Sequence, residues 1–374
     1  MGKHICLASP HMSDEGYELE YIHDAFNKNW IAPLGENVNE FERAVKEYTG
    51  ANNAIALASG TSAVHLAMVE AGVGPRDTVF CQDVTFAASA NPIKYLGANV
   101  VFIDSERDTW NMDPEALKKA FELYGTPKVV EVVHLYGTPA KMDEICAICN
   151  EHNVPLIEDA AEALGSEYKG KMCGTFGAFG VISFNGNKII TSSGGGMLLC
   201  DKEENAKHAL KLATQARELA PWYQHEEIGY NYRLSNISAG IGRGQMKVLD
   251  KRIRRKNEIC AMYEQGFADL PISVSPCPVY CKSNRWLTAI QLDADCGVTP
   301  GNVIAALKAQ DIESRHAWKP LHLQPVYEGA KYVSIAESPV ADDLFNRGVC
   351  LPSDTKMSDD DIQRVIDVIK SIFA

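Results

Sequence analysis

The sequence predicts an α/β protein with a large domain built on a mostly parallel sheet and a smaller C-terminal α/β domain. The first observation is length, because 374 residues, 46% of them hydrophobic and 23% charged, suffice for two buried cores. The second is alternation: from residue 54 onward, short apolar runs are separated by helical stretches of about ten residues or more. This pattern is typical of strands whose sheet is covered by helices on both faces.

The chain begins with two helical segments. Apolar residues recur at helical spacing over residues 14–30 and again over 38–50, where Gly50 ends the pattern. The irregular stretch 29–37, which contains Trp30 and Gly35, is suited to the mouth of a pocket.

Seven apolar runs then predict the strands of the large sheet. The last two follow each other with little room for a helix between them, so we expect at least one of them to run antiparallel. Ligands of such sheets bind beyond the carboxyl ends of the strands, and functional residues are expected there. The runs cover residues 54–57, 78–80, 99–104, 128–135, 154–159, 180–184 and 195–200.

Helical patterns dominate the next part of the chain, at residues 202–217 and in one long helix at about 237–267. The basic run KRIRRK in that helix, residues 251–256, is expected to be a solvated face. Later residues mix short strands (284–292) with helices (301–310 and 359–374). We therefore divide the chain into a large domain, residues 1–245, and a small domain, residues 246–374.

Charge and composition narrow the class of protein. A formal net charge of −13 argues against a nucleic-acid surface, although local cations can still form a pocket for an acidic substrate. The eleven cysteines are scattered and odd in number, as expected of reduced thiols. The segment MGKHICLASPHM lacks the features of a signal peptide, and no apolar run approaches the length of a membrane span. We expect a cytoplasmic protein with no metal site and no membrane or nucleic-acid partner.

Lys188 is a candidate nucleophile. The stretch SFNGNKIITSSGGG, residues 183–196, places it between two apolar runs, ahead of hydroxyl side chains and three glycines. Partial desolvation in a tight turn between buried strands lowers the pKa of a lysine and frees its amine to attack a carbonyl. A lysine that binds a carbonyl cofactor such as pyridoxal phosphate (PLP) requires such a setting. An ordinary turn lysine in a hairpin explains this stretch equally well when it is taken alone.

The first strand leads into Ser59-Gly60-Thr61-Ser62 and then into a helix. Backbone N–H groups and hydroxyls at a helix N-terminus bind anions, so Gly60, Thr61 and Ser62 form a candidate phosphate site. Simple capping of the helix is the alternative, and for this stretch alone it is the stronger one.

Two carboxylates, Glu158 and Asp159, end the buried strand at residues 154–159. One of them is expected to cap a following helix, which leaves the other free to face a ligand. A PLP enzyme needs a buried carboxylate that keeps the pyridine nitrogen protonated. The chain between Asp159 and Lys188 is long enough for two more strands that return the lysine to the same end of the sheet. Phe86, just past a predicted strand, could stack on a flat heterocycle, although such a residue more often belongs to a core.

Taken together, these motifs resemble those of the DegT/DnrJ/EryC1/StrS family of sugar aminotransferases, which are PLP enzymes with the aspartate aminotransferase-like fold (fold type I). The resemblance covers nearly the whole chain and keeps the order of the motifs. The resemblance is closest to the bacillosamine-pathway branch, and the motifs that indicate this branch are FNGNKIIT with SGGG and EDAAEALGS. The other marks are NWIAPLGENVNEFE, SGTSAVHLA, TFAASANPI, HLYGTPAKMDEI, GYNYRLSN and WKPLHLQPVYEGA.

The resemblance implies a role for each motif residue. Lys188 would be the Schiff-base lysine that also moves the proton, which excludes the related dehydratases that carry a histidine there. Asp159 would pair with the pyridine nitrogen, and Phe86 would stack on the ring. Asn231 would reach the phosphate of the neighbouring subunit, which implies a homodimer with shared sites. The residues implied in holding the phosphate within the subunit are Gly60, Thr61, Ser62 and Ser183.

Glu162 departs from most of the family, which has a glutamine there and a glutamate in the glycine run after the lysine. A carboxylate beside the phenolic oxygen of the cofactor would repel it unless it is protonated or paired. We therefore include Glu162 among the cofactor-binding residues and leave its role open.

The same resemblance implies a reaction. L-Glutamate would leave its amino group on the cofactor and depart as 2-oxoglutarate. The amine would then pass to the C4 ketone of UDP-2-acetamido-4-keto-2,4,6-trideoxyhexose, giving UDP-4-amino-4,6-dideoxy-N-acetylglucosamine by a ping-pong sequence. Another 4-keto nucleotide sugar, of the perosamine or TDP-sugar type, is the alternative substrate. Residues expected near the sugar nucleotide, for which exposed-loop positions are an equal alternative, are Trp30, Asn187, Arg315, His316 and His322.

Two other classes of protein are alternatives to a sugar aminotransferase. An NAD-dependent nucleotide-sugar dehydratase or epimerase would explain the glycine spacing of residues 174–180 and the pair Tyr124 and Lys128. However, these glycines precede a strand, and the tyrosine–lysine stretch contains glycine and proline and is not helical. A non-catalytic regulator with the PLP fold would be favoured if Lys188 or Asp159 were absent, and both are present.

Overall fold

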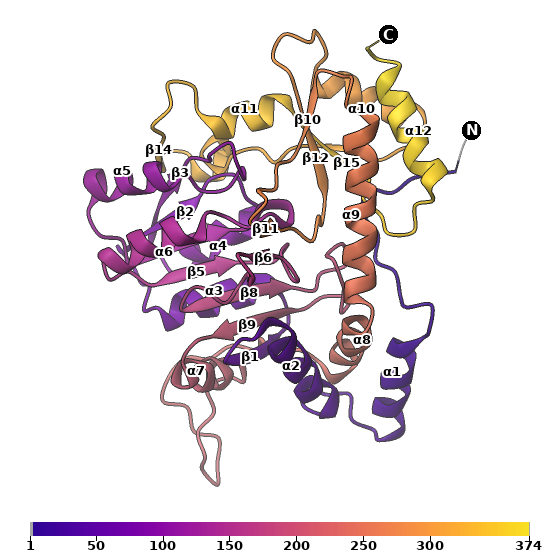
Figure 1. Cartoon of the computed structure of the whole chain (residues 1–374). Coiled ribbons are helices and arrows are strands. Elements are labelled where there is room, and N and C mark those ends of the chain that lie inside the picture. Colours follow the sequence, from indigo (N-terminus) through magenta and orange to yellow (C-terminus); the bar gives the residue numbers. More distant parts are fainter. Residues whose placement is uncertain (1–2, 374) are drawn as a thin grey trace.

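An eight-stranded sheet forms the centre of the molecule (Figure 1). In the computed structural model, which describes residues 3–373, its strand order is β1-β9-β8-β5-β4-β2-β3-β14. β9 runs antiparallel to both neighbours, whereas the remaining neighbours pair in parallel. This confirms the mostly parallel sheet and the antiparallel strand expected in the last pair. The strands are β1 (Asn53–Leu57), β2 (Thr78–Gln82), β3 (Asn99–Ile103), β4 (Val129–Val133), β5 (Leu156–Asp159), β8 (Phe179–Ser183), β9 (Gly196–Cys200) and β14 (Lys331–Val333).

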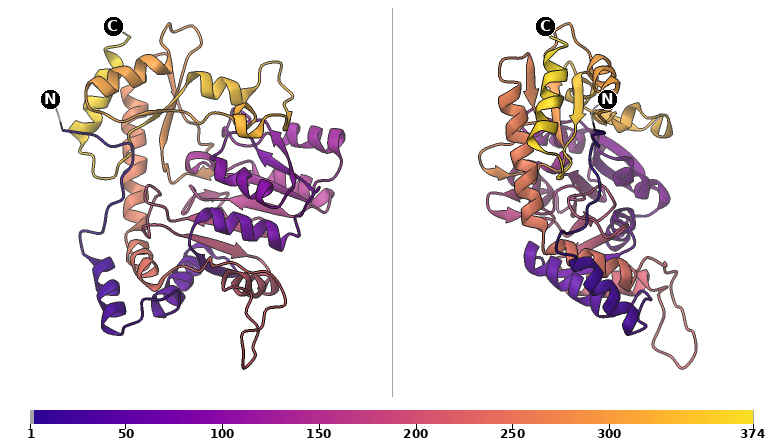
Figure 2. Two further views of the ribbon diagram at one scale, coloured as in Figure 1. Left: turned by 180° about the vertical axis from the view of Figure 1, so that it is seen from behind. Right: turned by 90° about the vertical axis from the view of Figure 1, so that its right-hand side faces the viewer.

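Helices cover both faces of this sheet, as the apolar strands predict (Figures 1 and 2). One face packs against α3, α4 and α7, and the other packs against α5 and α6 and, near β1 and β9, against α2 and α8. α1 lies beside α8. The bounds are α1 (Tyr17–Asn27), α2 (Glu36–Thr49), α3 (Gly60–Glu70), α4 (Ala87–Tyr95), α5 (Pro114–Tyr124), α6 (Met142–Glu151), α7 (Glu203–Ala213) and α8 (Asn236–Met246).

A second, four-stranded sheet has the order β10-β12-β15-β13, and its paired strands are all antiparallel. Its core is shared with α9, α10 and α12. The strands are β10 (Ile272–Val274), β12 (Thr288–Leu292), β13 (Arg315–His316) and β15 (Gly348–Leu351), and the helices are α9 (Leu249–Gly266), α10 (Pro300–Ala309), α11 (Val340–Arg347) and α12 (Asp359–Lys370).

Segments far apart in the sequence connect the two sheets. β14 comes late in the chain and extends the edge of the large sheet beside β3. β11 (Cys281–Lys282) pairs with β6 (Glu167–Tyr168), which also pairs with β7 (Lys171–Met172). The division at residues 245 and 246 stays a prediction. Residues 1 and 2 of MGKHICLASPHM, the segment that lacks the features of a signal peptide, lie outside the described residues, as does residue 374 of the helix predicted at 359–374.

The single long helix expected at residues 237–267 is wrong, because α8 ends before a break at Lys247 and Val248 and α9 begins after it. The two helices serve different partners. Glycines let α8 pack closely on the large-sheet side, where a Cβ on Gly242 would lie 2.5 Å from the Phe41 ring. α9 instead packs on the second sheet and α12. One continuous helix could not follow both surfaces.

The basic run KRIRRK is also not a fully solvated face. Arg252 and Lys256 are buried, and the guanidinium of Arg252 donates to the backbone oxygen of His11. The Lys256 Nζ donates to the backbone oxygen of Trp286 over 2.8 Å. Burial lowers the pKa of Lys256 to about 7. Within residues 3–373, the structure has no helix that is long and apolar enough to cross a membrane.

Candidate active site

A cavity of about 400 Å³ opens at the carboxyl ends of the parallel strands. Its lining combines the start of α3, the end of β5, the β8–β9 loop and residues from the C-terminal part of the chain. Chain segments that are distant in sequence therefore meet at the place where the topology predicts a ligand. The sequence-predicted residues that line it are Gly60, Thr61, Phe86, Asp159, Glu162, Ser183, Asn187, Lys188, Arg315 and His316.

Lys188 lies in the cavity on the loop between β8 and β9. Its side chain is only 12% exposed, and its Nζ lies 3.2 Å from Glu162 Oε1 and 4.2 Å from the ring centroid of Trp286. The Trp286 indole N–H donates to the backbone oxygen of Asn187 over 2.7 Å, which links the tryptophan to the residue before the lysine. This setting differs from that of an ordinary turn lysine, which would point into water.

Glu162 is a buried carboxyl beside this lysine. Its Oε2 accepts the backbone N–H of Tyr136 over 2.8 Å, while Oε1 faces Lys188. Burial raises the pKa of Glu162 to about 7, and the nearby Lys188 opposes that rise. The carboxyl is thus paired, which is one of the two conditions under which it could stand near a cofactor oxygen.

Asp159 presents its carboxylate to the same cavity. Its Oδ2 accepts from the Ser89 hydroxyl over 2.7 Å, and its Oδ1 accepts the backbone N–H of Ala161 over 3.0 Å. Ser89 in turn lies 2.7 Å from the Thr85 hydroxyl, Oγ to Oγ1. These contacts fix the orientation of the carboxylate at the end of β5.

No helix directly follows β5 in the described part of the chain, so neither Glu158 nor Asp159 caps one, and that expectation is wrong. Glu158 is buried, and its oxygens accept backbone N–H groups from Gly174, Phe176 and Gly177 over 2.8, 2.5 and 2.6 Å. The glycine-spaced turn that resembles a dinucleotide motif therefore uses these N–H groups to bind a carboxylate. It also precedes β8 and opens no helix, which argues further against an NAD site.

The start of α3 combines capping with a surface for an anion. Ser59 caps the helix by accepting the N–H of Ser62 over 3.0 Å, and its hydroxyl lies 2.7 Å from that of Ser62. Gly60 and Thr61 face the cavity instead, at the end of the helix where N–H groups have no intrahelical acceptor. A Cβ on Gly60 would lie 3.1 Å from that of Ser183, so glycine permits the close approach of this turn to β8.

Four sequence-predicted residues lie outside the cavity lining. Ser62 is buried in the α3 cap, and Asn231 is exposed and forms a bridge with Thr214. Trp30 is half-exposed in the loop between α1 and α2. The His322 Nδ1 lies 2.6 Å from Asp83 Oδ2, and the ring stacks on Tyr332.

Aromatic residues form part of the cavity wall near Lys188. Trp318 lies with its ring centroid 5.9 Å from Phe86, 5.3 Å from Tyr136 and 6.3 Å from Trp286. Phe86 is 63% exposed, so it belongs to the cavity wall and not to a core. Trp286, Trp318 and Ser89 were not predicted as site residues from the sequence. Trp318 lies in the motif WKPLHLQPVYEGA and Ser89 in TFAASANPI, so these two motifs could have indicated them.

The chemistry of these groups fits PLP. The cavity lining includes the Lys188 amine, the oriented Asp159 carboxylate and a cluster of N–H and hydroxyl donors, which match the aldehyde, pyridine nitrogen and phosphate of that cofactor. Its volume is within the range of about 300–1,000 Å³ that small-molecule sites occupy. Lys188, Asp159 and the group Gly60, Thr61 and Ser183 would hold these three parts.

Changing Glu162 to glutamine should alter how stability depends on pH. Because the pKa of Glu162 is raised in the fold, the native state holds a proton between about pH 4.5 and 7 that the unfolded chain has lost, and stability falls as pH rises through this window. Glutamine does not titrate, so the difference in unfolding free energy between the proteins should change by about 3 kcal/mol from pH 4.5 to 8. Urea unfolding of the cofactor-free proteins across this range measures it, and a pH-independent difference would contradict the assignment.

Comparisons with known proteins identify the family of the chain. The sequence model of the DegT/DnrJ/EryC1/StrS aminotransferase family matches residues 13–370. EpsN of Bacillus subtilis, provisionally named a pyridoxal phosphate-dependent aminotransferase, is 51% identical over 380 residues, which cover 100% of this chain and 97% of EpsN. GDP-perosamine synthase of Caulobacter vibrioides is 34% identical over 372 residues, which cover 98% of each chain.

A solved structure shows the same architecture. The aminotransferase TlmJ from Streptoalloteichus hindustanus superposes with a TM-score of 0.90 at 28% identity and covers 98% of both chains. The fold is therefore that of the type I PLP enzymes, as the sequence motifs imply. This chain belongs to the DegT/DnrJ/EryC1/StrS aminotransferase family and is a PLP-dependent sugar aminotransferase.

Proposed function

We propose that this enzyme transfers the amino group of L-glutamate to C4 of a UDP-linked 4-keto-6-deoxy-N-acetylhexosamine, giving UDP-4-amino-4,6-dideoxy-N-acetylglucosamine. The observation that carries the transfer chemistry is the placement of the Lys188 amine and the Asp159 carboxylate in one cavity. The choice of sugar is supported by the SGGG and EDAAEALGS motifs, which place Gly194, Gly195 and Glu162 in the lining of that cavity.

Residues that line the site would hold the cofactor. When bound, PLP supplies an aldehyde that condenses with amines and a ring that withdraws electrons from the reacting carbon. Asp159, oriented by Ser89 and Ala161, would hold a proton on the pyridine nitrogen. Gly60, Thr61 and Ser183 would bind the phosphate.

Lys188, assisted by Glu162, would move the proton between the reacting carbon atoms. The lysine amine must remove a proton from one carbon and return it to another, and Glu162 lies 3.2 Å from it. A carboxyl with a pKa of about 7 can hold or release a proton near neutral pH, so Glu162 could assist the lysine in either direction. Phe86, Trp286 and Trp318 line the cavity in which this exchange would take place.

Arg315 and His316 supply the groups that would bind the acidic substrates. Both lie on β13, are exposed, and line the cavity. Arg315 places a cation at the mouth of the site of an otherwise acidic chain, which suits the glutamate carboxylates and the sugar diphosphate in successive half-reactions. Asn187, beside Lys188, would contact the sugar. Trp30 and His322 lie away from the lining in this subunit, so any contact they make depends on a change of conformation or on a second subunit.

We also propose a homodimer with shared sites, in the cytoplasm. The segment between α7 and α8 protrudes from the molecule (Figure 1) and exposes large apolar side chains, as does the region of α1. Asn231 lies near the end of this segment and would reach the partner's phosphate site. A mass in solution of twice 41.0 kDa supports the dimer, and a stable monomer refutes it. The eleven free cysteines fit a reducing compartment. The exposed apolar residues are Leu19, Phe26, Trp30, Ile31, Leu34, Leu219, Trp222, Tyr223 and Ile228.

The alternative substrate is a GDP-linked 4-keto sugar, which the likeness to GDP-perosamine synthase favours. We expect the purified enzyme, supplied with glutamate and a panel of 4-keto nucleotide sugars, to turn over the UDP-linked N-acetyl sugar with a kcat/KM at least about tenfold above the GDP- and TDP-linked sugars, a difference worth about 1.4 kcal/mol of transition-state binding. Mass spectrometry of the products measures it. A preference for the GDP sugar would replace the proposed substrate and leave the transaminase chemistry intact.

A further inference from the structure

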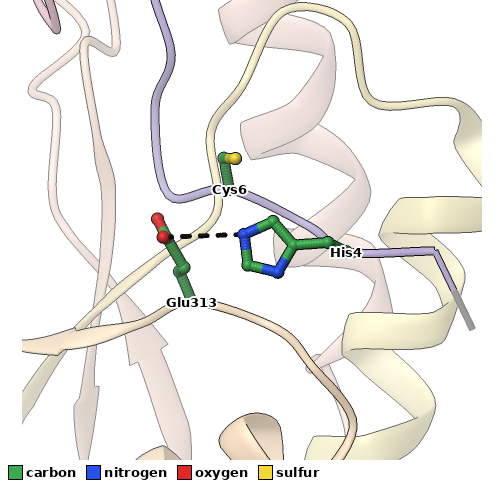
Figure 3. A group of neighbouring side chains, drawn as sticks. All are labelled: His4, Cys6 and Glu313. Atoms are coloured by element: carbon green, nitrogen blue, oxygen red, sulfur yellow. Dashed lines mark ion pairs between the residues drawn. The ribbon is translucent and has the colours of Figure 1, made fainter. Parts of the chain in front are cut away.

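A second group of reactive side chains lies near the start of the chain, outside the lining of the cofactor cavity. His4 and Cys6 come from the extended segment before α1 and Glu313 from the segment that follows α10, and their side chains lie together in Figure 3. One imidazole nitrogen, one sulfur and one carboxylate oxygen are all within 4.8 Å of one another. We propose that these three residues bind a Zn²⁺ ion, in contrast to the absence of a metal site expected from sequence.

The backbone explains why these side chains converge. Ile5 and Ile312 form a parallel bridge, and both are buried in the core of the second sheet. Successive side chains of an extended strand point to opposite faces, so burying the two isoleucines turns their flanking residues outward on a common side. Two backbone hydrogen bonds fix the pairing, from Ile5 N–H to the oxygen of Asp311 (3.1 Å) and from Glu313 N–H to the oxygen of Ile5 (2.9 Å).

The distances suit a tetrahedral ion. The His4 Nε2 and Glu313 Oε1 lie 3.6 Å apart. Two ligands of a tetrahedral zinc, each about 2.1 Å from the metal, lie about 3.4 Å from each other. Binding therefore requires only small rotations, and Cys6 gives up its thiol proton to solvent when it ligates. The mixed nitrogen, sulfur and oxygen donors favour zinc over magnesium or calcium, and a fourth position would remain open to water.

Outer contacts already orient two of the ligands. The His4 Nδ1 lies 2.9 Å from Asp311 Oδ1, so the ring donates there and keeps the lone pair of Nε2 directed to the site. Glu313 Oε2 accepts the N–H of Leu7 over 2.8 Å, which leaves Oε1 for the ion. A carboxylate behind a ligating histidine is the usual arrangement in zinc sites.

The ion would connect two walls of the catalytic cavity. Leu7 follows Cys6 directly and lines that cavity. Arg315 and His316 follow Glu313 by two and three residues and line it too. Clamping the two segments together would fix these three residues relative to each other. The site itself does not depend on the proposed sugar substrate.

The test uses full-length, tag-free enzyme with its cofactor, cleared of metal by a chelator. Titration with Co²⁺ as the spectroscopic probe should give one strong site with the near-ultraviolet absorbance of a thiolate–cobalt bond, and Zn²⁺ should displace the Co²⁺. Cys6→Ser should remove the band and weaken Zn²⁺ binding at least about 100-fold, because loss of an outer partner alone costs about 10–100-fold. Cys296→Ser, which changes another half-buried free cysteine, should leave both unchanged.

One further variant and one further measurement keep the proposal testable if Cys6→Ser misfolds. Glu313→Gln keeps an acceptor for the Leu7 N–H but loses the ligating charge, and it should weaken Zn²⁺ binding while the melting temperature without metal stays unchanged. Zn²⁺ should raise the melting temperature of the natural enzyme and not that of Cys6→Ser. A cobalt spectrum without the thiolate band, or equal Zn²⁺ affinity in the natural enzyme and Cys6→Ser, would overturn the proposal.

Discussion

We expect the Lys188→Ala variant to lose transamination by at least about 10⁴-fold while the protein stays folded. The lysine is the amine in the cavity that faces Glu162 and Trp286, and it serves both as the nucleophile toward the cofactor and as the base that moves the proton. Removing both roles at once leaves only binding. Coupled detection of 2-oxoglutarate measures the loss, and the melting temperature reports whether the fold survives.

Two further lysine variants test whether activity depends on the nucleophilic amine of Lys188, on its positive charge or on any buried lysine. Lys188→Arg keeps a positive charge beside Glu162 but offers no nucleophilic amine, and it should be as inactive as alanine. Lys256 is the matched control, since it is buried with a lowered pKa but donates to the Trp286 backbone away from Asp159. Lys256→Met should retain PLP binding and measurable turnover. An active Lys188→Arg, or loss of the bound cofactor in Lys256→Met alone, would contradict the assignment of Lys188.

The second large loss of activity is expected for the Asp159→Asn variant. Asparagine keeps the shape and can still accept from Ser89, but it removes the charge that would hold a proton on the pyridine nitrogen. We expect kcat to fall by about 10²–10³-fold, the cost of losing one oriented electrostatic contact in a closed site. The rate of the half-reaction with glutamate alone measures it in stopped-flow absorbance.

Glu131 provides a control carboxyl near Asp159. It is fully buried on β4, and burial raises its pKa well above the usual range, which favours the protonated form. Glutamine resembles this protonated form in volume and carries no charge, so Glu131→Gln should leave kcat within about threefold. If both variants lost activity equally, the effect would lie in the packing of β4 and β5 and not in the charge of Asp159.

The strands and their ends were predictable from sequence because burial on both faces leaves continuous apolar runs. Each of the seven runs became a strand of the large sheet. Since parallel strands end at one edge, the order of Asp159 and Lys188 along the chain was enough to place them together. The apolar run 195–200 became the antiparallel β9 because the connection before it has no helix to cross the sheet.

Features that depend on docking between distant segments were not predictable. Trp286 and Trp318 belong to the C-terminal part of the chain, and only the contact of that part with the large sheet brings them to Lys188. The burial of Lys256 in KRIRRK likewise depends on the backbone of Trp286, to which its amine donates. Helical periodicity continues across Lys247 and Val248, so the pattern alone could not show where α8 ends.

The measurement that tests the account most directly is a single-turnover reaction with L-glutamate in the absence of any sugar. Purified enzyme loaded with PLP should lose its visible cofactor absorbance and release about one 2-oxoglutarate per subunit, as a ping-pong mechanism requires. Adding the UDP-linked 4-keto sugar should then restore the absorbance and yield about one amino sugar per subunit. A protein that stays colourless with PLP, or that releases no 2-oxoglutarate from glutamate, would contradict the assignment of Lys188 and Asp159 as the centre of an aminotransferase.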